Sequence, residues 1–161
     1  MDARYRPTGG FTLIELVITV AIVGLLATAA MPLAQLSAQR SKETDLRTNL
    51  RVIRDAIDAY KLASDQGRVE TKLGTSGYPP TLQTLVDGVE DARSEGKTKI
   101  YFLRRMPRDP FFPDGTLPAA DTWGLRSYAS PPDAPQPGDD VYDVYSMSNG
   151  RGINGAPYHD W

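Results

Sequence analysis

The residues with the clearest chemical potential lie near the N-terminus, where Glu15 is the single charged side chain between Phe11 and Ala34. A carboxylate placed centrally in a membrane helix costs about 2.5–3.5 kcal/mol on insertion scales. A carboxylate kept at such a cost is a candidate functional group. Directly before this segment, Gly9 and Gly10 form an unhindered peptide. A protease that cut there would leave the apolar residues attached to the rest of the chain.

The apolar segment (residues 11–34) is long enough to cross a membrane as a helix. Its uncharged part, Leu16 to Ala34, would extend about 29 Å, close to the ~30 Å hydrocarbon core of a bilayer. A buried core helix is one alternative, but the remaining residues are too few to cover a helix on every side. A secretory signal peptide cleaved near residues 27–29 is another, and the charge of Glu15 argues against it.

The start of this segment resembles the prepilin processing motif of type IV pilins and pseudopilins, and it reads Gly-Phe-Thr-Leu-Ile-Glu-Leu from Gly10 to Leu16. The resemblance implies that a prepilin peptidase removes residues 1–10, cutting between Gly10 and Phe11, and N-methylates Phe11. It also implies that Glu15 is the assembly residue and that Pro32 kinks the helix.

The role implied for Glu15 has a physical basis. Cleavage would create a charged amine on Phe11, and that amine needs a counter-charge inside an apolar bundle of helices. The carboxylate of Glu15 in a neighbouring subunit could supply it. The alternative is that the Glu15 side chain only reaches the lipid headgroups.

A long helix is predicted to continue beyond the apolar segment. Residues 35–63 contain no glycine or proline, and their apolar residues recur at helical spacing on one face. These residues are Leu46, Leu50, Ile53, Ile57 and Tyr60. The pattern predicts that residues 35–63 are the amphipathic continuation of one helix that runs from near residue 12 to near residue 63, with this face forming one wall of a globular core.

The C-terminal part, residues 64–161, has a different composition. It holds 11 of the 13 prolines and 11 of the 14 glycines, which predicts a head rich in turns and loops. We expect a short helix at 82–89, with Thr81 as its N-cap, and short strands at 99–103, 125–129 and 141–147. The predicted fold class is α+β and pilin-like: a long N-terminal helix, transmembrane in its first half, packed on a small antiparallel sheet.

The head is similar to one branch of the same family, the major pseudopilin (protein G) of type II secretion. The Asp-Pro and Trp-Gly pairs of that branch are normally contiguous, whereas here the residues from Phe111 to Thr122 separate them as an insertion of 12 residues. That branch also implies a calcium ion in the C-terminal loop. The oxygen ligands expected for it here are Ser146, Asn149 and Asp160, with Asn149 in place of the branch's aspartate. The alternative is a loop held without metal by Tyr158 and Trp161.

Several other kinds of site are disfavoured. The absence of cysteine excludes disulfides and thiolate chemistry, and the single histidine, His159, excludes a multi-histidine metal centre. The glycines from Gly150 to Gly155 fit G-x-G-x-x-G, but too few residues follow for a dinucleotide fold. The adjacent Asp139 and Asp140 are typical of a solvated loop. A formal net charge of −2 predicts no nucleic-acid partner.

Together these features predict a non-enzymatic subunit anchored by one helix in the bacterial inner membrane. The basic residues Arg4 and Arg6 predict a cytoplasmic N-terminus and a periplasmic head. The resemblance implies self-assembly into a periplasmic pseudopilus that drives protein export. It also implies contacts with membrane lipid, prepilin peptidase, minor pseudopilins and an inner-membrane assembly platform. A type IV pilin of a surface pilus, for adhesion, motility or DNA uptake, is the alternative within the family. A membrane-anchored periplasmic binding module is the alternative outside it.

Overall fold

A computed structural model describes residues 10–72, 74–96 and 98–161, and residues 1–9 of the predicted leader (1–10) lie outside them. The chain divides into two compact units, Met1–Gln39 and Arg40–Trp161. We refer to them as the N-terminal unit and the C-terminal unit.

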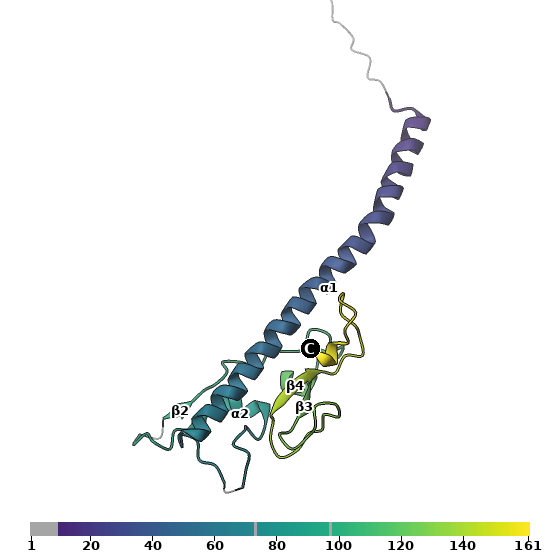
Figure 1. Cartoon of the computed structure of the whole chain (residues 1–161). Helices are drawn as coiled ribbons and strands as arrows, with labels where there is room; N and C mark the ends of the chain where they lie inside the picture. Colours follow the sequence, from purple (N-terminus) through teal and green to yellow (C-terminus); the bar gives the residue numbers. More distant parts are fainter. Residues whose placement is uncertain (1–9, 73, 97) are drawn as a thin grey trace, which may run out of the picture. The chain divides into compact units, whose positions relative to one another are not determined.

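One helix, α1 (Leu13–Asp65), accounts for most of the described part of the N-terminal unit and continues into the C-terminal unit (Figure 1). The long N-terminal helix predicted from the sequence is therefore confirmed, within two residues at each end. The helix includes Pro32 without interruption, and the kink expected there stays a prediction. Its most apolar 18-residue window has no buried residues, and its length and composition suffice to cross a membrane.

In the C-terminal unit, α1 contributes one wall of the hydrophobic core, as its apolar spacing predicted. Five side chains at intervals of four and three residues are all at most 5% exposed: Leu46, Leu50, Ile53, Ile57 and Tyr60. They pack with buried residues from the rest of the unit, which include Leu85, Trp123 and Val144. Because each such side chain contributes about 1.5–3 kcal/mol when buried, this stripe is a major stabilising surface of the unit.

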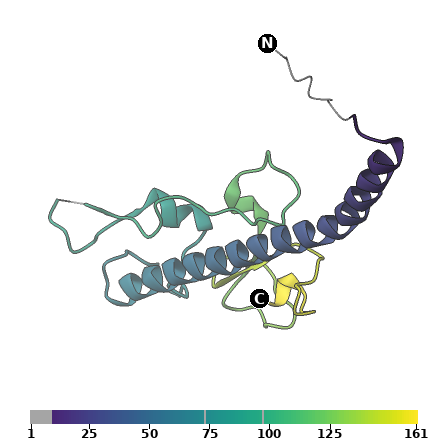
Figure 2. The same cartoon turned by 90° about the horizontal axis from the view of Figure 1, so that it is seen from above.

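The remaining elements are short. They are α2 (Leu82–Asp87), β1 (Val89–Glu90), β2 (Lys99–Ile100), the 3₁₀ turn η1 (Ala119–Thr122), β3 (Trp123–Arg126), β4 (Asp143–Ser146) and the 3₁₀ turn η2 (Tyr158–Asp160). The N-cap predicted at Thr81 is confirmed, because its side chain accepts a hydrogen bond from the Thr84 N–H at 3.3 Å. Figure 2, turned by 90°, shows these elements and loops gathered along the second half of α1.

The strands form two antiparallel pairs rather than the single three-stranded sheet that the sequence suggested. β1 pairs with β2, and β3 pairs with β4 in a register that places Gly124 opposite Tyr145. β3 ends at Arg126, before the expected residue 129, because the next two N–H groups turn to other acceptors. Ser127 donates to the carbonyl of Gln136 and Tyr128 donates to the carboxylate of Asp140.

The insertion from Phe111 to Thr122 forms an ordered loop that ends in η1. The guanidinium of Arg108 closes the loop by donating to the carbonyls of Asp114 and Leu117. At its end, the fully buried Thr122 accepts a hydrogen bond from the Asp109 N–H at 3.1 Å and donates to the carbonyl of Ala119 at 2.7 Å. The loop is thus attached to the core at both ends.

The close packing of the β3–β4 pair predicts that Gly124 does not tolerate a larger side chain. A methyl group on Gly124 would lie 2.3 Å from the Tyr145 ring, far inside normal contact distance. We expect Gly124→Ala to destabilise the protein by about 1–3 kcal/mol, because overpacking forces ring and backbone to shift. Thermal unfolding of the full chain in detergent measures this. Gly115→Ala, where nothing lies within 4 Å, is the matched control. Equal melting temperatures for the two variants would contradict the prediction.

Candidate functional site

The predicted processing and assembly segment begins immediately before α1. Gly10 and Phe11 are exposed and lie outside the helix, which starts at Leu13. Thr12 caps the helix: its hydroxyl accepts a weak hydrogen bond from the Glu15 N–H at 3.4 Å, and its carbonyl accepts one from Leu16 at 3.2 Å. The peptide expected to be cut is therefore accessible and non-helical.

Besides its predicted assembly role, Glu15 lies in the first turn of α1, where a carboxylate suits helix capping. Thr12 and Glu15 have the spacing of a capping box, in which a Ser or Thr N-cap is followed three residues later by Glu or Gln. A carboxylate in the first turn also interacts favourably with the positive end of the helix dipole. The hydrogen bond present comes from the Glu15 main chain, so a capping role for its side chain rests on this spacing and has to be separated from any assembly role.

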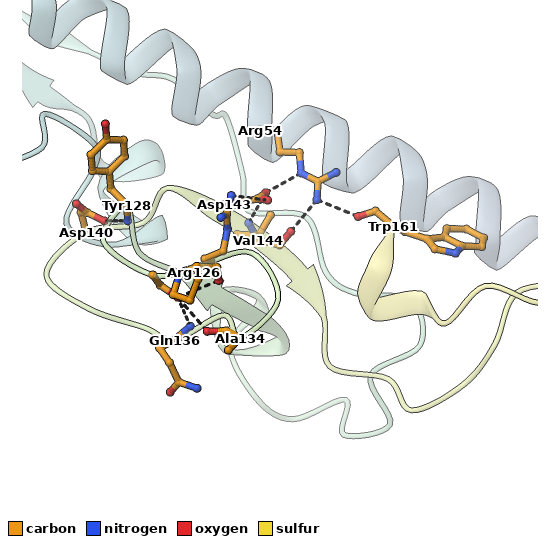
Figure 3. A network of polar contacts seen from close by, with 11 residues as sticks. Arg54, Arg126, Tyr128, Ala134, Gln136, Asp140, Asp143, Val144 and Trp161 are labelled. Atoms are coloured by element: carbon orange, nitrogen blue, oxygen red, sulfur yellow. Dashed lines mark hydrogen bonds and ion pairs between the residues drawn. The ribbon is translucent and has the colours of Figure 1, made fainter.

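Arg54 links α1 to the sheet and to the C-terminal segment of the chain (Figure 3). Its Nε donates to Oδ1 of Asp143 at 2.8 Å, and its Nη2 donates to the main-chain oxygens of Val144 at 3.1 Å and Trp161 at 2.9 Å. Arg126 adds a second cation, with Nη2 at 3.7 Å from Oδ2 of Asp143. One guanidinium therefore fixes three segments that are distant in sequence.

A second link between α1 and the C-terminal loop is the buried carboxylate of Glu43. Its Oε1 accepts hydrogen bonds from the Ile153 N–H at 2.9 Å and from the Tyr158 hydroxyl at 3.1 Å. The Tyr158 ring stacks on Phe111 with the ring centroids 4.1 Å apart, so the start of the insertion also packs on this loop. Sequence reasoning missed Glu43 because nothing local to a helical glutamate indicates a partner 110 residues away.

The glycines that suggested a dinucleotide motif serve close aromatic packing. A methyl group on Gly152 would lie 2.4 Å from the Trp161 ring, and one on Gly150 would lie 2.9 Å from the Tyr158 ring. On the other side of Trp161, the Arg47 guanidinium lies 4.1 Å from the ring centroid. The contacts expected for a loop held by Tyr158 and Trp161 are thus present.

The three residues expected to bind calcium line one hollow of about 400 Å³, together with Asp133, Ser148 and His159. The hydroxyl of the buried Ser146 is already engaged, because it donates to Oδ2 of Asp109 at 2.6 Å. Asp160 is exposed, and its Oδ1 lies 2.9 Å from Nε2 of His159. Asp133, which the sequence did not single out as a ligand, also lines the hollow, so the hollow is bordered by two aspartates and an asparagine. No cluster of three or more acidic, histidine or cysteine side chains at metal-binding distance occurs in the described residues.

Asp140, the second of the adjacent acids Asp139 and Asp140, has a structural role. Asp140 accepts hydrogen bonds from the Ser76 hydroxyl and, at 2.8 Å, from the Tyr128 N–H. It lies beside a hollow of about 640 Å³ that is lined partly by Tyr60, Tyr78 and Tyr128. Burial raises the pKa of the Tyr78 hydroxyl above its ordinary value. Asp140 therefore holds its loop in place through hydrogen bonds with Ser76 and Tyr128.

Together, the exposed Gly-Phe peptide, the helix of membrane-crossing length and the small antiparallel head resemble those of pilin-like proteins. Residues 5–31 match the family described as the prokaryotic N-terminal methylation motif.

Within that class, the chain is similar over most of its length to proteins named type II secretion system core protein G. The protein from Klebsiella pneumoniae is 28% identical over 138 residues, which cover 82% of this chain and 91% of the relative. The protein from Dickeya chrysanthemi is 25% identical over 161 residues, which cover 97% and 96%. The type IV major pilin protein PilA of Myxococcus xanthus is 37% identical, but over 79 residues that cover 48% of this chain and 35% of PilA. No solved structure gives a significant match. The resemblance to the major pseudopilin is thereby confirmed.

The Arg54 contacts generate a second test. Arg54→Lys keeps the positive charge but cannot reproduce the three-way geometry of the guanidinium. We expect a loss of about 1–2 kcal/mol in unfolding free energy, measured by denaturant titration of the full chain in detergent. Arg51→Lys is the control on the same helix, because the Arg51 side chain is exposed. A difference of zero between the two variants would show that the Arg54 contacts contribute nothing to stability.

Proposed function

We propose that this protein is a major-pseudopilin-like subunit that polymerises into a periplasmic filament and drives protein export by type II secretion. The observation that carries the proposal is the motif from Gly10 to Glu15, placed directly before an exposed, membrane-length apolar helix. The extended similarity to the core G proteins supports the same role. The protein would act as a structural subunit and not as an enzyme.

Maturation would begin at the accessible peptide between Gly10 and Phe11, cut by a prepilin peptidase that also methylates the new amine. The basic leader orients the chain with its N-terminus in the cytoplasm and its head in the periplasm. The helix holds the subunit in the inner membrane until it joins the filament. An assembly platform and minor pseudopilins would be its partners there.

Assembly would bring the charged amine of Phe11 into a bundle of apolar helices. Exposed large side chains cover the helix there; they include Leu13, Ile14, Val17, Val20 and Leu25. In so apolar a surrounding an unpaired ion is far more costly than a paired one, so the carboxylate of Glu15 on a neighbouring subunit is the expected partner. The amine–carboxylate pair would then favour one relative position of adjacent helices.

Type IV pilins supply the competing function, a surface pilus. The similarity to PilA favours it only over the part of the chain that the two share, which is about half of this sequence. A periplasmic binding module is the other alternative. Mass spectrometry of the mature protein separates it from both filament functions, because N-methyl-Phe11 marks a processed pilin-like subunit.

Glu15 can be tested so that its capping and assembly roles give different results. Glu15→Ala removes the charge and the side chain that a capping box needs, although the main-chain Glu15 N–H still reaches Thr12. Glu15→Gln removes only the charge and keeps a side chain that suits a capping box. We expect both variants to insert in the membrane and to carry N-methyl-Phe11 but to form no filaments, as judged by sedimentation of sheared material. Filament formation by Glu15→Gln alone would show that capping, not charge pairing, is the essential role.

We also propose that the hollow at the C-terminal loop binds calcium. The side-chain oxygens of Asn149, Asp160 and Asp133 would supply ligands, with main-chain oxygens near Ser146 completing the set. A bound ion would add a cross-link between β4, the segment after it and the loop at 130–135. The contacts of Glu43 and Arg54 would still anchor the loop to α1 in its absence.

The calcium proposal is tested by metal removal. An ion that binds only the folded protein raises the melting temperature as its concentration exceeds the dissociation constant. We therefore expect millimolar calcium to raise, and a chelator to lower, the melting temperature of the full chain. Asp160→Asn should abolish most of this response. Asp114→Asn, a change in an acidic residue outside the hollow, is the control and should keep it. An unchanged melting temperature with and without calcium would overturn the proposal.

A further inference from the structure

The solvent-facing side of α1 in the C-terminal unit carries a divided set of charges. Three basic residues come first, then three acidic ones: Arg40, Arg47, Arg51, Asp55, Asp58 and Asp65. All six residues are exposed. We call this set the charge stripe.

The six positions share one face of the helix. At about 100° per residue, they fall within an arc of roughly 80°. The buried residues from Leu46 to Tyr60 centre roughly 140° away around the helix, so the charge stripe points away from the core of its own unit. The uncharged positions within the same arc are Thr44 and Leu62, and Leu62 is 58% exposed.

Most side chains of the charge stripe have no polar partner among the described residues of the chain. Among the described residues, the side chains of Arg40, Arg51, Asp55 and Asp58 form no hydrogen bond or ion pair. The remaining two members have neighbours: Arg47 lies over the Trp161 ring, and Asp65 pairs with Lys61. A helix face with separated, unpaired charges of both signs is complementary to a shifted copy of itself.

We propose that the charge stripe is a contact surface for a second copy of this chain and that it favours an axial offset between neighbouring subunits. The inference rests on the proposed filament function, since subunits anchored in one membrane have parallel helices. Parallel helices in register would place basic beside basic and acidic beside acidic, which is unfavourable. A displaced neighbour brings opposite charges together.

The spacing of the charges defines the favoured displacement. An offset of about 14–15 residues, or about 21 Å, places Arg51 beside Asp65 and Arg40 beside Asp55 of the neighbour. An offset of about 18 residues, or about 27 Å, places Arg40 beside Asp58 and Arg47 beside Asp65. Neither arrangement brings two like charges of the stripe together. Shorter offsets of about seven residues pair Arg51 with Asp58 but also place Asp58 beside Asp65.

Cysteine cross-linking tests the offset directly, because the natural chain contains no cysteine. Thr48→Cys combined with Leu62→Cys reports an offset of 14 residues, and Thr44→Cys combined with Leu62→Cys reports one of 18. We expect at least one of these double variants to form ladders of cross-linked subunits in sheared filaments. Each single variant should remain monomeric, because its cysteines meet only when helices are in register. Efficient cross-linking of the single variants, or none in either double variant, would overturn the proposed offset.

Charge exchange tests whether the electrostatic attraction matters. R40E/R51E leaves Arg47 as the one basic residue of the stripe, and D55R/D58R leaves Asp65 as its one acidic residue. We expect each variant to lose assembly several-fold when expressed alone and to recover it when the two are co-expressed. R40E/R51E/D55R/D58R reverses four of the six charges and keeps both opposite-charge pairs of the 18-residue offset, so it should also assemble at that offset. Failure of both the mixture and the fourfold variant would contradict charge complementarity.

Controls keep this inference separable from the proposed function. Arg104→Glu and Glu95→Arg change exposed charges away from α1 and should leave assembly unchanged. Equal melting temperatures for all variants show that folding is intact. If the wild-type chain forms no filaments at all, the proposed function fails. If it forms filaments whose assembly ignores the stripe, only this inference fails.

Discussion

The structure depends on one constraint: a single helix has to be stable in two different surroundings. Over residues 13–34 the side chains of α1 are predominantly apolar on all faces and Glu15 is the single charge, so lipid or other helices are the surroundings that suit them. From Leu46 onward the apolar residues narrow to one stripe, and that stripe organises the core of the C-terminal unit. The change in periodicity along one continuous helix therefore determines which part folds against its own chain and which part needs other molecules.

The short elements of the C-terminal unit would be weak in isolation. Two-residue strands and a six-residue helix provide little stabilisation of their own, because an isolated two-stranded pair is marginal in water. Their positions are fixed from α1 by side chains that reach across the unit. Arg54 contacts β4 and Trp161, and Glu43 holds the loop that leads into η2. The helix thus acts both as a wall of the core and as the source of the polar links that order the loops.

Much of this fold could be predicted from local sequence. The buried face of α1 follows from a spacing of four and three residues, and the cap at Thr81 follows from its residue type. The strand boundaries could not be predicted. The residues around Ser127 and Tyr128 are compatible with a strand, but their N–H groups donate to Gln136 and Asp140 and not to β4. Partners of that kind depend on tertiary structure and have no local signature.

The candidate sites divide in the same way. The motif at Gly10 to Glu15 is contiguous, so sequence reasoning identifies it completely, although the capping relation between Thr12 and Glu15 is easily overlooked. The hollow near Asp160 is assembled from distant segments. Its second acid, Asp133, lies in a proline-rich loop whose sequence indicates only solvent exposure. Ser146 is a residue that the sequence suggested for the calcium site. Its hydroxyl instead donates to the buried Asp109, to which no local pattern links it.

The cap at Thr12 has a consequence for maturation. The groups that cap the N-terminal end of α1 belong to Thr12, Glu15 and Leu16, and all of them lie on the C-terminal side of the Gly10–Phe11 peptide. Cutting that peptide would therefore change the charge at the end of the chain without unwinding a turn or moving the start of the helix. Precursor and mature subunit would share one helical conformation, and the switch between stored and assembling forms would be purely electrostatic.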